Sequence, residues 1–164
     1  MMSYFKKNKT IFFLLSVVCV LVFLTGCGQK TYEPVAINPA VDTCGQCKMA
    51  VEDGAFAAQL FLGDGTSMKF DDIGCMVDYL IDAGSQQKIA DRYVRDLNTN
   101  EWVRLEAATF VTNTGVGSPM NYDIVAFKDK AQAEQFSKEK NLQDALLTGE
   151  QILQAKPERK KPSH

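Results

Sequence analysis

An uncharged apolar run from Ile11 to Phe23 most constrains how this chain folds, because it sets the N-terminal segment apart from the rest. The run has 13 residues, which is short for a membrane-spanning helix and typical of the hydrophobic region of a signal peptide. Lys6, Lys7 and Lys9 form the cationic region that precedes such a run. We therefore expect the folded domain to lie in the remainder of the chain.

The tetrapeptide Leu24-Thr25-Gly26-Cys27 follows the run and resembles the bacterial lipobox, where a peptidase cleaves before the cysteine and the thiol carries a diacylglycerol. Residues 1–26 are then a lipoprotein signal peptide, and Cys27 anchors an extracytoplasmic protein to the cell membrane through its lipid. An uncleaved N-terminal anchor with an incidental cysteine is the alternative.

The chain from Cys27 onward carries 15 Lys and Arg against 20 Asp and Glu, which gives a formal charge of −5. A nucleic-acid-binding protein would show a basic excess, so we expect no nucleic-acid partner. The thiols besides that of Cys27 belong to Cys44, Cys47 and Cys75. Three thiols outside the cytoplasm cannot all pair within one chain, so at least one is free, paired between chains or bound to a ligand.

The remainder divides into three parts by composition. Residues 27–41 contain Pro34 and Pro39 without periodicity, which predicts a tether that follows the lipidated cysteine. Residues 42–155 carry the periodic segments and form the expected domain. Residues 156–164 are basic and contain two prolines, which predicts a disordered tail.

Within the expected domain, the sequence predicts an α+β fold made of two small strand–turn–strand–helix halves. An Asp-Gly turn at residues 63–65 predicts the first hairpin, and Asp71 or Asp72 is expected to cap the helix after it. The second half is expected to begin with a hairpin over residues 92–105. The predicted strands are 57–62, 66–70, 92–97, 102–105, 109–114 and 123–127, and the predicted helices are 73–84, 129–140 and 142–153.

The strongest chemical signal is Cys44-Gly45-Gln46-Cys47-Lys48-Met49, which places two thiols and a thioether within six residues. Soft sulfur ligands select Cu(I), so Cys44, Cys47 and Met49 are candidate ligands of this ion. A structural zinc site lacks a fourth ligand, since the single histidine is the terminal His164. Two alternatives remain open, a thioredoxin-like redox pair and a structural Cys44–Cys47 disulfide. The redox motif normally follows a strand, and no strand is predicted before Cys44.

Two further sulfur residues are possible ligands. Cys75 lies in the first turn of a predicted helix, where the helix dipole favours a thiolate. The alternative is a cysteine that is packed in the core and has no chemical role. Met120 ends a loop rich in glycine and proline that can present its thioether, or it fills the core. The adjacent carboxylates of Asp71 and Asp72 diverge, so they are expected to cap a helix rather than act as an acid/base pair.

The order of these motifs resembles the NosL family of nitrous-oxide-reductase accessory lipoproteins. The resemblance rests on the lipobox, Cys-Gly-Gln-Cys-Lys-Met, Phe-Asp-Asp-Ile-Gly-Cys-Met, Ser-Pro-Met and a closing Ile-Val-Ala-Phe strand, over about residues 27–140. It implies a Cu(I)-binding metallochaperone, not an enzyme, that helps to deliver copper to nitrous-oxide reductase or its maturation apparatus. It also implies two related halves similar to part of organomercurial lyase.

Carried onto this chain, the family motif marks Cys44, Cys47 and Met49 as ligands, with Met120 or Cys75 completing the site. The chain has Lys48 where the family often has glycine, and it has no internal histidine to match the members that use one. Two other functions stay open at this point. One is an extracytoplasmic thiol-disulfide oxidoreductase that uses Cys44 and Cys47, and the other is a metal-free lipoprotein binding subunit.

Overall fold

The computed structural model describes residues 30–82, 86–142 and 145–159. The predicted signal peptide, the lipidation site Cys27, the end of the helix predicted over residues 73–84 and the last five residues of the tail lie outside these ranges. No helix in the described ranges is both long enough and apolar enough to cross a membrane.

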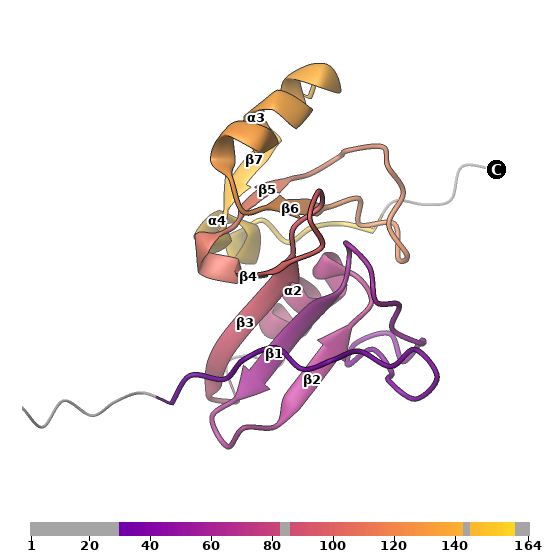
Figure 1. Ribbon diagram of the computed structural model, residues 1–164, viewed down its shortest axis with the longest axis vertical. Coiled ribbons are helices and arrows are strands. Elements are labelled where there is room, and N and C mark those ends of the chain that lie inside the picture. Colours follow the sequence, from indigo (N-terminus) through magenta and orange to yellow (C-terminus); the bar gives the residue numbers. More distant parts are fainter. Residues whose placement is uncertain (1–29, 83–85, 143–144, 160–164) are drawn as a thin grey trace, which may run out of the picture. The chain divides into compact units, whose positions relative to one another are not determined.

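The first sheet contains four antiparallel strands in the order β2-β1-β3-β4 (Figure 1). The predicted hairpin is present, and the helix α2 after it packs on β1 and β2. The elements are β1 (Ala58–Leu62), β2 (Ser67–Phe70), α2 (Ile73–Asp82), β3 (Ile89–Arg95) and β4 (Trp102–Arg104).

The hairpin over residues 92–105 does not begin the second half as expected, because β3 pairs with β1 and completes the first sheet. The reason lies in β1, whose residues are buried with the exception of Leu62. A buried strand needs hydrogen-bond partners along both edges, and β2 covers one edge only. Strand β3 covers the other edge, with Val94 opposite Ala58.

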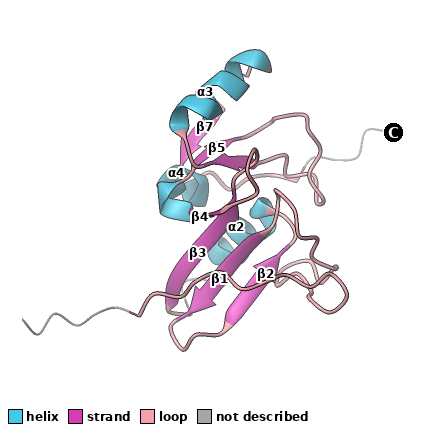
Figure 2. Cartoon of the chain, viewed as in Figure 1, coloured by secondary structure: helices cyan, strands magenta, loops and turns pink. Residues whose placement is uncertain are grey.

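The second sheet has the order β6-β5-β7, and all its pairings are antiparallel. The helix predicted over residues 142–153 is wrong at its start, because Leu146–Thr148 is strand β7 and pairs with β5. Helix α4 begins only at Gly149, where Thr148 and Gln151 form a capping box. Figure 2 separates these strands and helices by colour. The elements are η1 (Leu105–Ala107), β5 (Thr109–Val111), β6 (Val125–Phe127), α3 (Lys130–Glu139), β7 and α4 (Gly149–Gln154).

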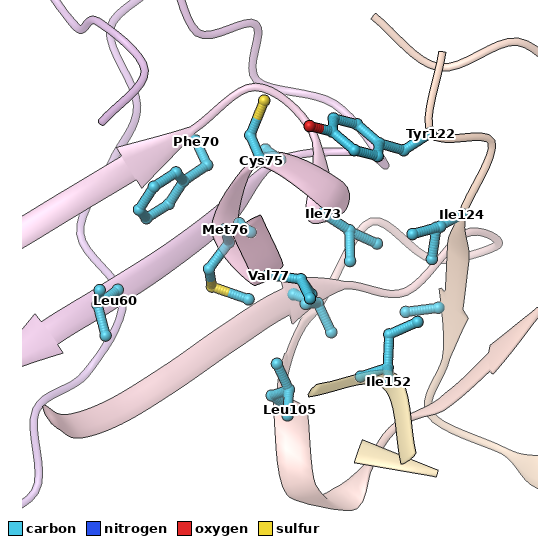
Figure 3. Packing of buried hydrophobic residues seen from close by; sticks show 14 of the residues in the cluster. Leu60, Phe70, Ile73, Cys75, Met76, Val77, Leu105, Tyr122, Ile124 and Ile152 are labelled. Carbon is cyan, nitrogen blue, oxygen red and sulfur yellow. The ribbon is translucent and has the colours of Figure 1, made fainter. Parts of the chain in front are cut away.

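One hydrophobic core joins the two sheets (Figure 3). Side chains of α2 such as Met76 and Val77 belong to the same buried cluster as Ile124 and Ile152 of the second half. The main chain joins them as well, since Asp96, just after β3, forms a parallel bridge with Ala126 of β6. The α+β fold class with two small halves is therefore confirmed.

The C-terminal part of the segment expected to be a tether packs on the first sheet. The buried side chain of Gln59 on β1 bonds to both the N–H and the C=O of Val35. The ring of Tyr32 stacks on Phe61, and Ile37 joins the core. Packing thus begins about ten residues before Asp42, where the sequence placed the domain start.

The described part of the tail also makes contacts. The guanidinium of Arg159 lies 5.6 Å from the centroid of the Tyr122 ring. The tail residues 156–159 therefore lie against the second half, where they line a pocket with Thr112 and Tyr122.

Candidate metal centre

The Cys-x-x-Cys motif forms a closed loop ahead of the first strand. The N–H of Cys44 donates to the carbonyl of Met49 at 2.7 Å, and the N–H of Lys48 donates to the carbonyl of Cys44 at 3.1 Å. Thr43 and Ala50 form an antiparallel bridge that closes the loop. These bonds hold Cys44 buried and Cys47 half-buried at one end of the loop.

Strand β2 holds this loop in place. The N–H of Gly45 donates to the carbonyl of Lys69 at 2.8 Å, and the Lys69 ammonium pairs with Asp42 at 2.5 Å. A Cβ atom at Gly45 would lie 2.9 Å from the Phe70 ring. Glycine is therefore required because the loop main chain lies directly on the side chains of β2.

Lys48 adopts a left-handed conformation, with φ of +66°. Such a φ costs a residue with a Cβ atom about 1–2 kcal/mol relative to glycine. A glycine at this position would adopt the same φ without that cost. The Lys48 ammonium donates to the carbonyl of Gly45 at 2.6 Å and so crosses the loop.

The first turn of α2 supplies a third thiol. The Asp72 carboxylate accepts the N–H of Gly74 at 2.9 Å, and its carbonyl accepts the N–H of Met76, so Asp72 is the helix cap. Cys75 then lies in the first turn, as predicted, and it is fully buried. Figure 3 shows its sulfur pointing away from Met76 and Leu105, at the side of α2 where Tyr122 lies.

Three thiols and a carboxylate meet at this point. One ligand atom from each of Cys44, Cys47, Cys75 and Asp71 lies within 4.8 Å of each of the others. The three cysteines are free thiols, and the Cys47 thiol donates to the Asp71 carboxylate at 3.4 Å. The sequence placed Asp71 among the helix caps, and no spacing rule could have assigned its carboxylate to the cysteine loop.

The four titratable groups of the cluster differ in the direction in which their pKa values are shifted. The Cys75 thiol donates to Cys44, which lowers the pKa of Cys44 to about 4 and raises the pKa of Cys75. Burial raises the pKa of Cys47 to about 11, and burial also raises the pKa of Asp71 to about 6. Cys44 is therefore the thiol of the cluster that gives up its proton most readily, and a metal that binds here displaces the protons that the thiols still hold.

The two candidate methionines lie in different settings. The side chain of Met49 is 55% exposed at the end of the cysteine loop. The N–H of Met120 donates to the Asp72 carboxylate at 3.1 Å, and its side chain is partly buried against the core. The structure therefore brings the main chain of Met120 to the first turn of α2, beside the cluster residue Asp71.

The cluster offers a chemistry that the sequence could only partly predict. Thiolates are soft donors, and three of them around one point suit a soft or borderline cation of low coordination number. Cys44, Asp71 and Cys75 are buried, while Cys47 is half-buried, so the cluster is reached from the side of Cys47. The sequence predicted Cys44 and Cys47 as ligands with Cys75 as a possible further one, and the fold brings all three thiols together.

Comparison with known proteins identifies a family and a shared fold. The family model NosL matches residues 34–152, whereas no match was found among curated proteins. The crystal structure of the copper chaperone NosL from Shewanella denitrificans is similar with a TM-score of 0.67 and 19% sequence identity. The match covers 77% of this chain and 99% of that chain, and at this identity it shows a shared fold. From the family match over most of its length, this chain belongs to the NosL family.

Proposed function

We propose that this chain is a lipid-anchored Cu(I) chaperone that helps to assemble the copper sites of nitrous-oxide reductase. The observation that carries the proposal is the meeting of the Cys44, Cys47 and Cys75 thiols within 4.8 Å of one another. Family membership supports it, as does the fold shared with a protein described as a copper chaperone. The role is to bind and transfer an ion, so the chain itself catalyses no reaction.

Cu(I) is the cargo, and the thiols bind it in a definite order. The half-buried Cys47 is the first thiol that an incoming ion meets, and the Cys44 thiol behind it has a lowered pKa. Binding at Cys47 releases its proton, because a thiolate and not a thiol ligates the metal. Cys75 is the third sulfur at the same point.

Release to a recipient requires a ligand that leaves easily. Met49 supplies a neutral thioether, which binds Cu(I) more weakly than a thiolate and whose side chain is 55% exposed. A recipient protein can therefore replace Met49 first and then Cys47, while the buried Cys44 holds the ion until the transfer is complete. Met120, whose main chain is bonded to Asp72, is a further thioether for this exchange.

The first test is a titration of the reduced full-length chain with Cu(I) in detergent against a competing Cu(I) chelator. We expect the Cys44→Ser/Cys47→Ser double variant to lose at least about 100-fold in affinity, since removal of supporting groups alone costs 10–100-fold. Met49→Leu is expected to slow transfer to the chelator, and Met76→Leu, which changes a buried methionine of α2, is the matched control. Equal affinities of the wild-type chain and the double variant would refute the proposal.

The recipient and the anchor need tests of their own. Copper-loaded chain mixed with copper-free nitrous-oxide reductase should raise the copper content of the reductase faster than free Cu(I) held by the same chelator. Radiolabelled fatty acid should enter the wild-type chain in cells and not the Cys27→Ser variant. Label in both chains or in neither would remove the lipid anchor from the proposal and leave the copper site standing.

A further inference from the structure

The C-terminal tail leaves α4 at a sharp turn that sends it back over the second half. Ala155 is still in a right-handed helical conformation, and its N–H donates to the carbonyl of Gln151. Lys156 then takes a left-handed φ of +45°, and the ring of Pro157 after it cannot continue the helix. The tail residues 156–159 therefore turn away from the helix axis and form one wall of a cavity of about 550 Å³.

The described part of the tail ends on Tyr122. The guanidinium of Arg159 lies 5.6 Å from the centroid of the Tyr122 ring, within the distance at which an aromatic face attracts a cation. The same ring packs on the first turn of α2, since a Cβ atom at Gly74 would lie 2.0 Å from its Cγ. Its hydroxyl donates to Asp78, further along α2. Tyr122 thus connects Arg159 to the helical turn that carries Cys75 (Figure 3).

The charge of Arg159 also acts on the thiols of the cluster. Burial lowers the pKa of the Arg159 guanidinium, but a hydrogen bond to Tyr122 outweighs this effect and raises the pKa overall. The ionised thiols of Cys75 and Cys47 raise the same pKa further, so the guanidinium and these sulfurs lie within electrostatic range of one another. The ion pairs of the described ranges do not include Arg159, so none of them neutralises its charge.

A thiol cluster that holds Cu(I) needs such a charge. Cu(I) carries a single positive charge, so two or three thiolates around it leave a net negative charge. Cys44 and Cys75 are fully buried, where uncompensated charge is costly. The ammonium of Lys48, in the cysteine loop itself, is bonded to the carbonyl of Gly45. A second cation at the side of Tyr122 therefore stabilises the loaded cluster.

We infer that Arg159 is a retention residue of the proposed Cu(I) centre: held on Tyr122, its guanidinium offsets the negative charge of the loaded thiol cluster and slows the loss of the ion. The inference rests on the proposed function, because it names a group that governs release from the same site. Arg159 acts through its charge and is not a ligand. Since its side chain is exposed, solvent screens the interaction, and the effect is modest and sensitive to salt.

The placement of Arg159 on the tail has a consequence for transfer. The retaining charge belongs to a segment that lies outside the helices and sheets. The cluster therefore holds its ion more tightly while the tail lies on Tyr122 than when the tail is displaced.

The test compares Arg159→Gln with the wild-type chain, both reduced, full-length and in detergent, by titration with Cu(I) against a competing chelator. The ionic strength is set to about 10 mM or about 1 M with a salt whose anion does not bind Cu(I). At the lower value we expect the variant to bind Cu(I) about two- to fivefold more weakly and to release it correspondingly faster. At the higher value the difference should fall below about 1.5-fold, because the Debye length is then about 3 Å.

Two further variants separate charge from structure. Arg159→Lys keeps the positive charge and should stay within about twofold of the wild-type affinity. The matched control is Lys156→Gln, which removes a positive charge from the same wall of the cavity and leaves Arg159 on Tyr122. It should change the affinity by less than about 1.5-fold at either ionic strength.

Several results would overturn the inference. A purely structural role of Arg159 would give a loss that persists at high salt and that lysine does not restore. An Arg159→Gln variant with wild-type affinity at low salt would also overturn it, as would a Lys156→Gln variant that loses as much. A wild-type chain that binds no Cu(I) would overturn it together with the proposed function, whereas the other results leave the proposed function standing.

Discussion

The hydroxyl of Ser118 donates to the carboxylate of Asp72 at 2.5 Å, although 46 residues separate them in the chain. Both residues are buried, and the N–H of Met120 donates to the same carboxylate oxygen at 3.1 Å. Burial raises the pKa of Asp72, while these donors and the N–H of Gly74 oppose that rise. The loop before β6 is in this way fastened to the first turn of α2, next to the candidate metal centre.

Ser118→Ala is expected to lower the free energy of unfolding by about 1–3 kcal/mol, because it leaves a buried carboxylate short of a donor. The measurement is urea denaturation of the metal-free chain at neutral pH. Ser67→Ala, an exposed serine on β2, is the matched control and should change the stability by less than about 0.5 kcal/mol. A Ser118→Ala variant as stable as this control would show that the bond is dispensable.

Gly74→Ala is expected to destabilise the chain by about 3 kcal/mol, the upper part of the range for an overfilled core. A Cβ atom at Gly74 would lie 2.0 Å from Cγ of Tyr122, and the hydroxyl of that tyrosine is bonded to Asp78, so the ring cannot simply move away. Gly54→Ala is the control, since nothing lies within 4 Å of its Cβ position. Thermal unfolding of both variants measures the difference, and equal melting temperatures would contradict the expected clash.

Lys48→Gly is expected to be more stable than Lys48→Ala by about 1 kcal/mol, because alanine retains the strain of a left-handed φ and glycine does not. Both variants lose the bond from the ammonium to the carbonyl of Gly45, so the comparison isolates the backbone. Chemical denaturation of the two metal-free chains provides the measurement. A more stable alanine variant would mean that the loop does not hold this conformation in solution.

Asp96→Asn is expected to remove about 2 kcal/mol of stability at pH 7, since the carboxylate accepts main-chain N–H groups of Asn98, Thr99 and Lys128. Burial acts to raise the pKa of Asp96, but these donors outweigh it, so the net pKa lies below the usual value. The contribution is therefore present above the unfolded pKa of about 3.9 and is lost as the pH falls through the lower folded value.

Denaturation of the wild-type chain and the Asp96→Asn variant at a series of pH values tests this linkage. The stability difference between the two should be constant from pH 7 to about pH 5 and should shrink below about pH 4. A difference that grows on acidification would show that the sign of the pKa shift is wrong.

Local patterns predicted most of the elements because most of them have a local cause. The Asp-Gly turn closes the first hairpin, and Asp129 caps α3 with its side chain on the N–H of Ala131. The strand β7 has no such local cause. Leu146 and Leu147 fit the spacing of a helix as well as that of a strand, and the choice is made by the edge of β5 that needs a partner.

The candidate site was predictable to the extent that its residues are close in sequence. Cys44 and Cys47 follow from spacing, and the motif order of the NosL resemblance, now confirmed by the family match, indicated copper. Cys75 and Asp71 lie beside them because the cysteine loop is bonded to Lys69 of β2, and the chain passes from β2 through Asp71 directly into α2. Such a long-range contact leaves no periodic trace in the sequence. The lipid at Cys27 and the likeness to organomercurial lyase remain predictions.

The core shared by the two sheets has a consequence for how the chain unfolds. A smaller cluster joins Val125 and Phe127 of β6 to Ala133 of α3 within the second half. The larger cluster packs residues of α2 and β1 with Phe110, Ile124 and Ile152, so removal of either sheet exposes part of the interior of the other. We therefore expect one cooperative transition that is the same for every spectroscopic probe, and no independently folding half on either side of residue 108. For the sulfur cluster this means that its geometry is a property of the whole cooperative unit. Conditions that loosen β6 or α4 lower metal affinity at a distance, by reducing the fraction of molecules in which the three thiols are brought together.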